Sequence, residues 1–113
     1  MLLEPLEPIR IKHGDAGRTI DHQLVDDDGN PVPLSGPTPT VILHCKGPVN
    51  FDASSVIILD PNLATVRATF SAANLLSPIG WYSCEYQATW SATRVETFPS
   101  NGFFQLEIVE EAA

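Results

Sequence analysis

The chain has 113 residues, of which 43% are apolar and 18% are charged, and these values are typical of one globular domain with its own core. Its formal net charge of −8, with only six lysines and arginines, argues against nucleic acid or an anionic membrane as a partner. No apolar run approaches the roughly 20 residues that span a bilayer. The start, MLLEPLEP, is acidic and interrupted by prolines, unlike a signal peptide, so we expect a soluble protein made in the cytoplasm.

The chain divides into three parts. Residues 1–9 contain Pro5 and Pro8, which cannot donate to a β-ladder, and this segment is predicted to be an extended arm. Residues 10–109 form the predicted domain, and 110–113 form an acidic tail. Within the domain, short β-type runs are separated by turn residues. In chain order these runs are 10–12, 18–25, 40–46, 54–59, 64–70, 77–90, 94–98 and 103–109.

The run at 77–90 is the predicted centre of the fold. Tyr82, Cys84, Tyr86, Ala88 and Trp90 alternate with polar residues at the two-residue period of a half-buried strand. The Tyr-x-Cys spacing is also typical of the tyrosine corner of immunoglobulin-like sandwiches. Seven or eight short strands with frequent turns predict an all-β, immunoglobulin-like antiparallel β-sandwich, with a small barrel as the alternative.

Three local features complete this prediction. The sequence DDDGNP at 26–31 predicts a tight turn because Asp-Gly supplies the positive φ that such a connection needs, and 32–34 returns from it. Residues 71–76 are the one plausible helical turn, with Ser71 as a possible N-cap. Runs 54–59 and 64–70 are predicted to form a hairpin around the turn residues at 60–62.

The alternation also predicts which side chains fill the core. The expected core residues are Val41, Leu43, Cys45, Phe70, Tyr82, Cys84, Tyr86 and Leu106. Two cysteines do not by themselves define a disulfide scaffold. Cys45 and Cys84 could therefore form a disulfide across the core or remain two buried thiols. The lack of an export signal favours the thiols.

The polar residues do not form a motif for catalysis or metal binding. Asp26–Asp28 precede a glycine, but Leu24 and Ser35 stand where an EF-hand loop needs ligands. The three histidines and two cysteines lack metal-binding spacings. His13 with Asp15 and His22 with Asp21 are the candidate catalytic pairs, yet neither belongs to a catalytic motif. We expect no enzyme activity, no metal and no cofactor.

Trp81 is the most informative exposed candidate. In the alternation of this run, the Trp81 side chain lies on the face opposite to Tyr82 and Cys84. It therefore either anchors an interface or is covered by proline-rich loops or the arm. Further candidate interface anchors are Leu2, Leu3, Leu6 and Phe103.

Several segments resemble, in the same order, the N-terminal domain family of tailed-phage upper-baseplate proteins and its small stand-alone virion relatives. The matching pieces are Gly14-Asp15, LVDDDGNPVPLSG at 24–36, Thr40-Val41, ILDP at 58–61 with the strand that follows, GWYSCEY at 80–86 and ETFPS at 96–100. The resemblance spans about 10–109. Compared with the large baseplate proteins, we expect no extension after the domain, and the chain carries Cys45 and Cys84 at core positions that ordinary apolar residues usually fill in the family.

The resemblance implies an immunoglobulin-like sandwich that assembles into a virion through symmetric protein–protein contacts, in the tail, baseplate or neck. Its partners would be copies of itself and other phage structural proteins, with no nucleic acid and no membrane. Such a protein would be made in the host cytoplasm and located in the virion. The alternative is a soluble recognition module that binds a glycan or a host surface protein through an exposed Trp81 or Trp90 beside loop carboxylates.

Overall fold

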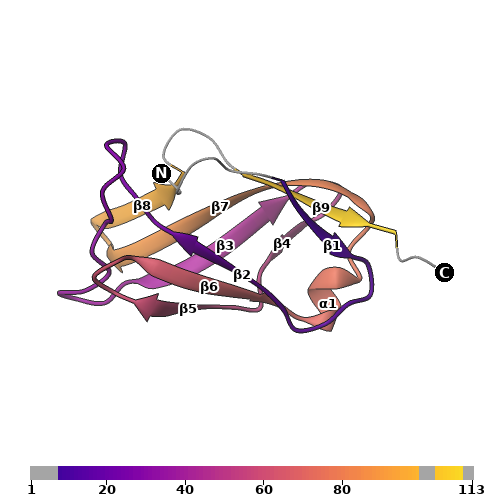
Figure 1. The fold of residues 1–113 in the computed structure, drawn as a ribbon, viewed down its shortest axis with the longest axis horizontal. Helices are drawn as coiled ribbons and strands as arrows, with labels where there is room; N and C mark the ends of the chain where they lie inside the picture. Colours follow the sequence, from indigo (N-terminus) through magenta and orange to yellow (C-terminus); the bar gives the residue numbers. More distant parts are fainter. Residues whose placement is uncertain (1–7, 100–103, 111–113) are drawn as a thin grey trace.

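A computed structural model describes residues 8–99 and 104–110, and in these ranges the protein is an all-β sandwich of two packed sheets (Figure 1). A single short helix, α1, joins the two sheets between β6 and β7. The elements are β1 (Ile9–Lys12), β2 (Arg18–Gln23), β3 (Thr40–Lys46), β4 (Asn50–Asp52), β5 (Ser55–Asp60), β6 (Thr65–Phe70), α1 (Ala72–Leu75), β7 (Gly80–Ser91), β8 (Arg94–Phe98) and β9 (Phe104–Val109).

The larger sheet has the order β1-β9-β7-β3-β4, and the smaller sheet has the order β2-β6-β5. β7 is long enough to pair with two strands along one side, with β9 over Gly80–Cys84 and with β8 over Tyr86–Ser91. β1 runs parallel to β9, so the prediction of a wholly antiparallel sandwich is wrong for this pair. No strand pairing links the two sheets in the described ranges, so the barrel alternative does not hold.

β7 forms the centre of the larger sheet, as its alternation predicts. Its even-numbered residues from Tyr82 to Trp90 are buried, and the odd-numbered residues between them face outward. The Tyr82 hydroxyl donates a 2.7 Å hydrogen bond to the Pro78 carbonyl oxygen, which is the contact expected of a tyrosine corner. The turn at Gly47 packs so closely on this corner that a Cβ atom there would lie 2.7 Å from the Tyr82 ring. The start of β7 is therefore fixed from two sides.

All eight residues predicted for the core are buried. The inward faces of β3, β6, β7 and β9 supply most of this core, because alternate side chains of a strand point to one face. Both cysteines are free, buried thiols, and Cys45 lies directly opposite Cys84 on neighbouring strands of one sheet. The disulfide alternative does not apply to this structure.

Several local predictions are confirmed. Ser71 caps α1: its Oγ accepts from the Asn74 N–H at 3.2 Å, and the Asn74 Oδ1 accepts from the Ser71 N–H at 3.0 Å. The 26–31 turn is held by the Asp26 carboxylate, which accepts from the Asp28 and Asn30 N–H groups at 2.9 Å. Capping and turn bonds of this kind depend on local sequence, so the residue types alone predict them.

Several predicted runs differ from the observed strands by one to three residues at an end, and three differences affect the arm or the list of strands. β1 begins at Ile9, inside the predicted arm, because this residue pairs with Leu106. Residues 32–34 do not form a strand; only Pro31 makes a bridge, to Val25. β4 spans only Asn50–Asp52 and was not predicted, since three residues are too few for a period to show.

Candidate functional site

The outer face of the larger sheet gathers polar side chains from three neighbouring strands. Because Cys45 and Cys84 point into the core, the residues beside them point outward. The strand register then sets rows across the sheet. One row joins Asp52, His44 and Glu85, and the next joins Asn50, Lys46 and Ser83.

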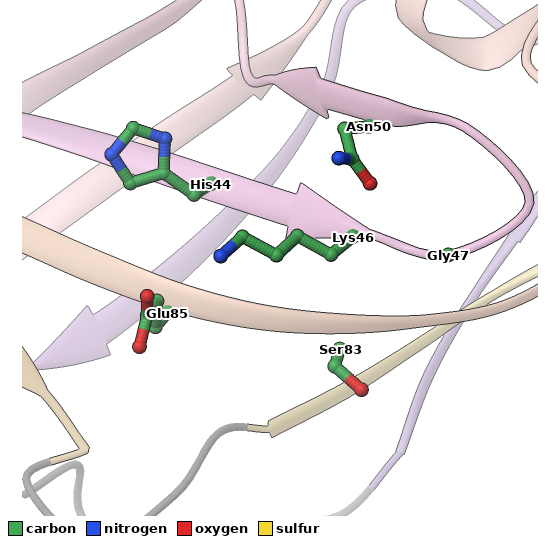
Figure 2. A pocket seen from close by; sticks show the side chains of 6 residues that line it. All are labelled: His44, Lys46, Gly47, Asn50, Ser83 and Glu85. Atoms are coloured by element: carbon green, nitrogen blue, oxygen red, sulfur yellow. The ribbon is translucent and has the colours of Figure 1, made fainter.

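These rows line a hollow of about 460 Å³, which we call the polar hollow (Figure 2). Its lining residues are His44, Lys46, Gly47, Asn50, Ser83 and Glu85. Figure 2 shows the Lys46 side chain lying along the sheet toward His44 and Glu85. Within the described part of the chain, the Lys46 ammonium makes no hydrogen bond or ion pair, so this cation is available to a ligand.

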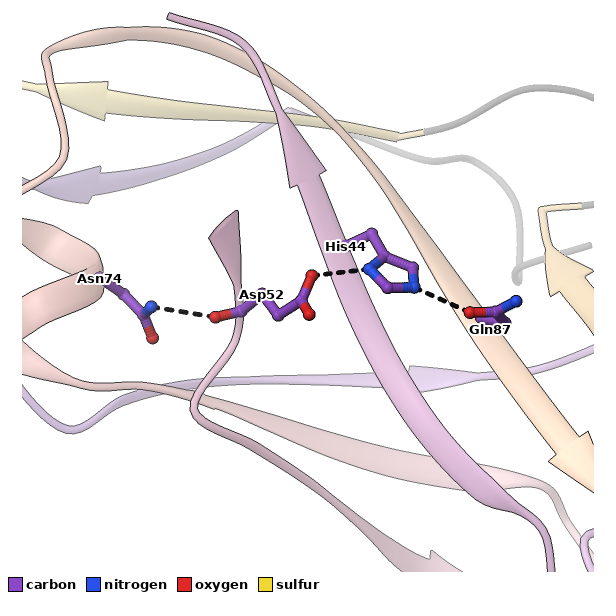
Figure 3. A network of polar contacts seen from close by, with 4 residues as sticks. All are labelled: His44, Asp52, Asn74 and Gln87. Carbon is purple, nitrogen blue, oxygen red and sulfur yellow. Dashed lines mark hydrogen bonds and ion pairs between the residues drawn. The ribbon is translucent and has the colours of Figure 1, made fainter. Parts of the chain in front are cut away.

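His44 is held in place by a chain of hydrogen bonds (Figure 3). Its Nδ1 lies 2.6 Å from the Asp52 Oδ1, and its Nε2 lies 2.9 Å from the Gln87 Oε1. The Asn74 amide Nδ2 in turn donates to the Asp52 carbonyl oxygen at 3.0 Å. The hydrogen bond to Gln87, followed by the bond and the charge of Asp52, raises the pKa of His44. Both ring nitrogens face oxygen acceptors, which suits a protonated imidazolium.

Trp81 lies on the same outer face, two residues before Ser83. It is 47% exposed, which agrees with the predicted outward phase. The Arg10 guanidinium lies 5.9 Å from the centre of the Trp81 ring and donates to the Glu107 carboxylate at 2.9 Å. Arg10 on β1 therefore borders the ring without covering it. Leu2, Leu3, Leu6 and Phe103 fall outside the described residues.

Trp90 does not belong to an exposed recognition surface, and this part of the alternative hypothesis is wrong. It is only 9% exposed, because it keeps the inward phase of Tyr82 and Tyr86 along β7. The Arg94 guanidinium covers its ring at 4.1 Å from the centre. Its Nε1 is buried without a hydrogen-bond partner in the described ranges.

The candidate catalytic pairs are not assembled. His13 contacts the Leu76 carbonyl oxygen at 3.3 Å, while Asp15 pairs with Arg18. His22 points inward to the Tyr86 hydroxyl, whereas Asp21 points outward and binds Arg67.

The histidine and the carboxylate of each candidate pair therefore have separate structural partners. Across residues 8–99 and 104–110, no group of three or more His, Cys, Asp or Glu side chains has the arrangement of a metal site.

A second candidate surface is the β5 edge, which we define as strand β5 with its outward side chains Ile57 and Leu59. Among the described residues β5 pairs only with β6, so its other side presents backbone groups without a strand partner in these ranges. Ile57 is 51% exposed and Leu59 is 43% exposed. The β-branched sequence predicts the strand, but its position at an edge depends on which strands pair, and sequence reasoning did not find it.

No family model matches the chain, and no curated protein matches it. In the described ranges, no helix is long and apolar enough to cross a membrane. The polar hollow and the β5 edge are therefore interpreted from their own geometry.

Proposed function

We propose that the protein is a non-enzymatic structural component of a tailed-phage virion that acts through symmetric protein–protein contacts. One structural observation supports association above all others: the β5 edge exposes Ile57 and Leu59 beside unpaired backbone groups. Exposed apolar edge strands are sites of strand pairing between chains. The placement in a virion rests on the family resemblance of the sequence.

We also propose that the sandwich belongs to the immunoglobulin-like class, as the family resemblance implies. In that class one sheet contains strands B, E and D, and the other contains G, F, C and C′. The orders β2-β6-β5 and β9-β7-β3-β4 match these sheets, while β1, which pairs with β9, and β8, which pairs with β7, lie outside this correspondence. The hydrogen bond from Tyr82 to Pro78 lies at the start of β7, which corresponds to strand F.

The proposed partners are copies of this chain and other structural proteins of the particle, which meet in the virion after synthesis in the host cytoplasm. A sandwich whose core joins both sheets is a stiff building block, so that contacts at its edges fix the orientation of neighbouring copies. The proposed arm would add a second contact. Pro5 and Pro8 lower the ordering cost of such an arm, since they favour an extended chain before binding.

Light scattering of the purified chain tests this function directly. The mass is measured from low micromolar to near-millimolar concentration, for the full chain and for a variant that lacks residues 1–7. This deletion spares Ile9, which pairs with Leu106 in β1. A defined oligomer in the full chain supports the proposal, and its loss on deletion assigns a role to the arm. A monomer at every concentration, alone and with candidate virion proteins, would overturn it.

One observation favours a second function, recognition of a glycan. Trp81 and the polar hollow lie on the same outer face, and saccharides bind where an aromatic ring stands beside polar side chains. A glycan array followed by NMR titration tests this, with the Trp81 indole N–H as the reporter. Trp81→Ala should abolish binding, while Trp90, which is buried, should show no direct shift.

A further inference from the structure

The edges of the two sheets differ in how they are protected. Natural edge strands avoid pairing between molecules by carrying charged side chains, prolines or bulges, or by being very short. In the described ranges every edge strand except β5 either carries a charged residue before its last position or, like β4, is only three residues long. The charged residues are Arg10 and Lys12 on β1, Arg18 and Asp21 on β2, Asp52 at the end of β4, and Arg94 and Glu96 on β8.

β5 has none of these protections in its central part. Its sequence SVIILD contains one charged residue, Asp60, at the last position. The Asp60 carboxylate accepts hydrogen bonds from the Asn62 and Leu63 N–H groups at 2.9 and 3.1 Å. It therefore stabilises the turn that follows β5. The register shift also lies at this end, between Ile58 and Asp60, and leaves 55–58 in regular pairing with β6. A regular, uncharged, apolar edge is therefore open to another strand.

The charges around the β5 edge indicate which kind of partner strand could pair with it. Ile57 lies opposite Arg67 on β6, but Arg67 is bound to Asp21 through two hydrogen bonds of 2.8 and 3.0 Å. The surface beside residues 55–58 of β5 is thus locally neutral, although the chain carries a net charge of −8 and the Asp60 carboxylate lies at the end of the strand. A charged partner strand would find no complementary charge along 55–58. A second β5, neutral and apolar in the same way, matches it.

We infer that β5 pairs antiparallel with β5 of a second copy and joins two smaller sheets into one continuous six-stranded sheet. This inference deepens the proposed function by naming its first contact. A two-fold axis makes the contact isologous, so the same patch serves both copies. Main-chain hydrogen bonds between the edges hold the pair, and the outward apolar side chains are covered by each other.

Side-chain phase limits the register. For outward residues to stay outward, odd-numbered residues must lie opposite odd-numbered residues of the partner strand. Two such registers place Ile57 opposite an aliphatic outward side chain of the partner strand. In one register Ile57 faces its own copy, and in the other Ile57 faces Leu59 of the second copy. In both, Cα atoms of opposite residues lie about 4.5–5.5 Å apart, which is within disulfide range.

Disulfide trapping tests the inference. Ile57→Cys alone, and an equal mixture of Ile57→Cys with Leu59→Cys, are oxidised under mild conditions. The matched control is Val95→Cys, because Val95 is 45% exposed and also lies on an edge strand, β8. The native thiols of Cys45 and Cys84 are buried and free, and unmodified protein provides their background. Circular dichroism verifies that each variant folds.

We expect covalent dimers to be the main product for one of the two β5 samples, and monomers for Val95→Cys. Oligomers in light scattering without β5 cross-links would overturn the β5 pairing but leave the proposed function, because another surface or partner would then carry assembly. A monomer by both methods would overturn the β5 pairing, and a monomer that also persists with candidate virion proteins would overturn the proposed function as well. Equal cross-linking of the β5 and Val95 variants indicates random collision and also overturns the inference.

Discussion

The His22 Nδ1 lies 2.8 Å from the Tyr86 hydroxyl oxygen, and this contact joins the smaller sheet to the larger one. His22 belongs to β2 and Tyr86 to β7, and both rings pack against Phe104 of β9. Burial is the main cause that lowers the pKa of His22, from its ordinary value of 6.5 to about 4. A neutral imidazole is thus part of the interior.

The first prediction concerns stability at low pH. Since the folded pKa of His22 is depressed, the unfolded chain binds more protons between pH 6.5 and about 4, and the free energy of unfolding falls as pH falls through this window. The loss is about 3 kcal/mol at most. His22→Asn offers a non-titrating amide near the Nδ1 position and should flatten this part of the profile. Urea unfolding across pH checks it; an unchanged slope in the variant would contradict the account.

For His44, the contribution to the free energy of unfolding should change with pH in the opposite direction. Its folded pKa is raised, so its contribution to stability is fully present below about pH 6.5 and is lost as pH rises through the folded value. The group is partly exposed, which makes this contribution small. Gln87→Leu removes the principal hydrogen bond and should lower the pKa of His44 in an NMR titration. Gln105→Leu, on the outer face of β9, is the matched control and should leave that pKa unchanged.

Removal of the tyrosine-corner hydrogen bond should destabilise the fold without changing its shape. Tyr82→Phe keeps the buried ring and deletes the hydroxyl that donates to the Pro78 carbonyl at 2.7 Å. The expected loss is about 1 kcal/mol in the free energy of unfolding. Denaturant unfolding measures it, and circular dichroism should be unchanged. A variant as stable as the parent would show that the corner does not fix the start of β7.

The two buried thiols should not react with thiol reagents while the protein is folded. The Cys45 thiol and burial raise the pKa of Cys84, and the thiolate is the reactive form. Both thiols should therefore react with a thiol reagent only as fast as the chain unfolds. Ile57→Cys adds an exposed thiol that should react at once and provides the positive control. Rapid labelling of either native cysteine under folding conditions would contradict their burial.

The sequence predicts those parts of the fold that depend on one strand at a time. The alternation in β7 and β9 identifies Tyr82, Cys84, Tyr86 and Leu106 as core residues, because the pleat places every second side chain on one face. The cap of α1 depends on Ser71 and Asn74, three residues apart, and the residue type suffices to predict it.

What the sequence does not show depends on how strands pair. The His44 chain needs Asp52 from β4 and Gln87 from β7, and only the sheet register brings them to one ring. The openness of β5 and the parallel pairing of β1 with β9 are likewise properties of strand order. Periodicity carries no information on strand order, so the polar hollow and the β5 edge become visible only in the structure.

Sedimentation velocity of three proteins over a concentration series tests whether the chain associates through the β5 edge. The proteins are the parent, Ile57→Lys, and the matched control Val95→Lys. Lysine near the two-fold axis places like charges close together at an interface, so Ile57→Lys should weaken association on the order of tenfold or more. The parent and Val95→Lys should form the same dimer. Equal association in all three proteins would contradict association through this edge.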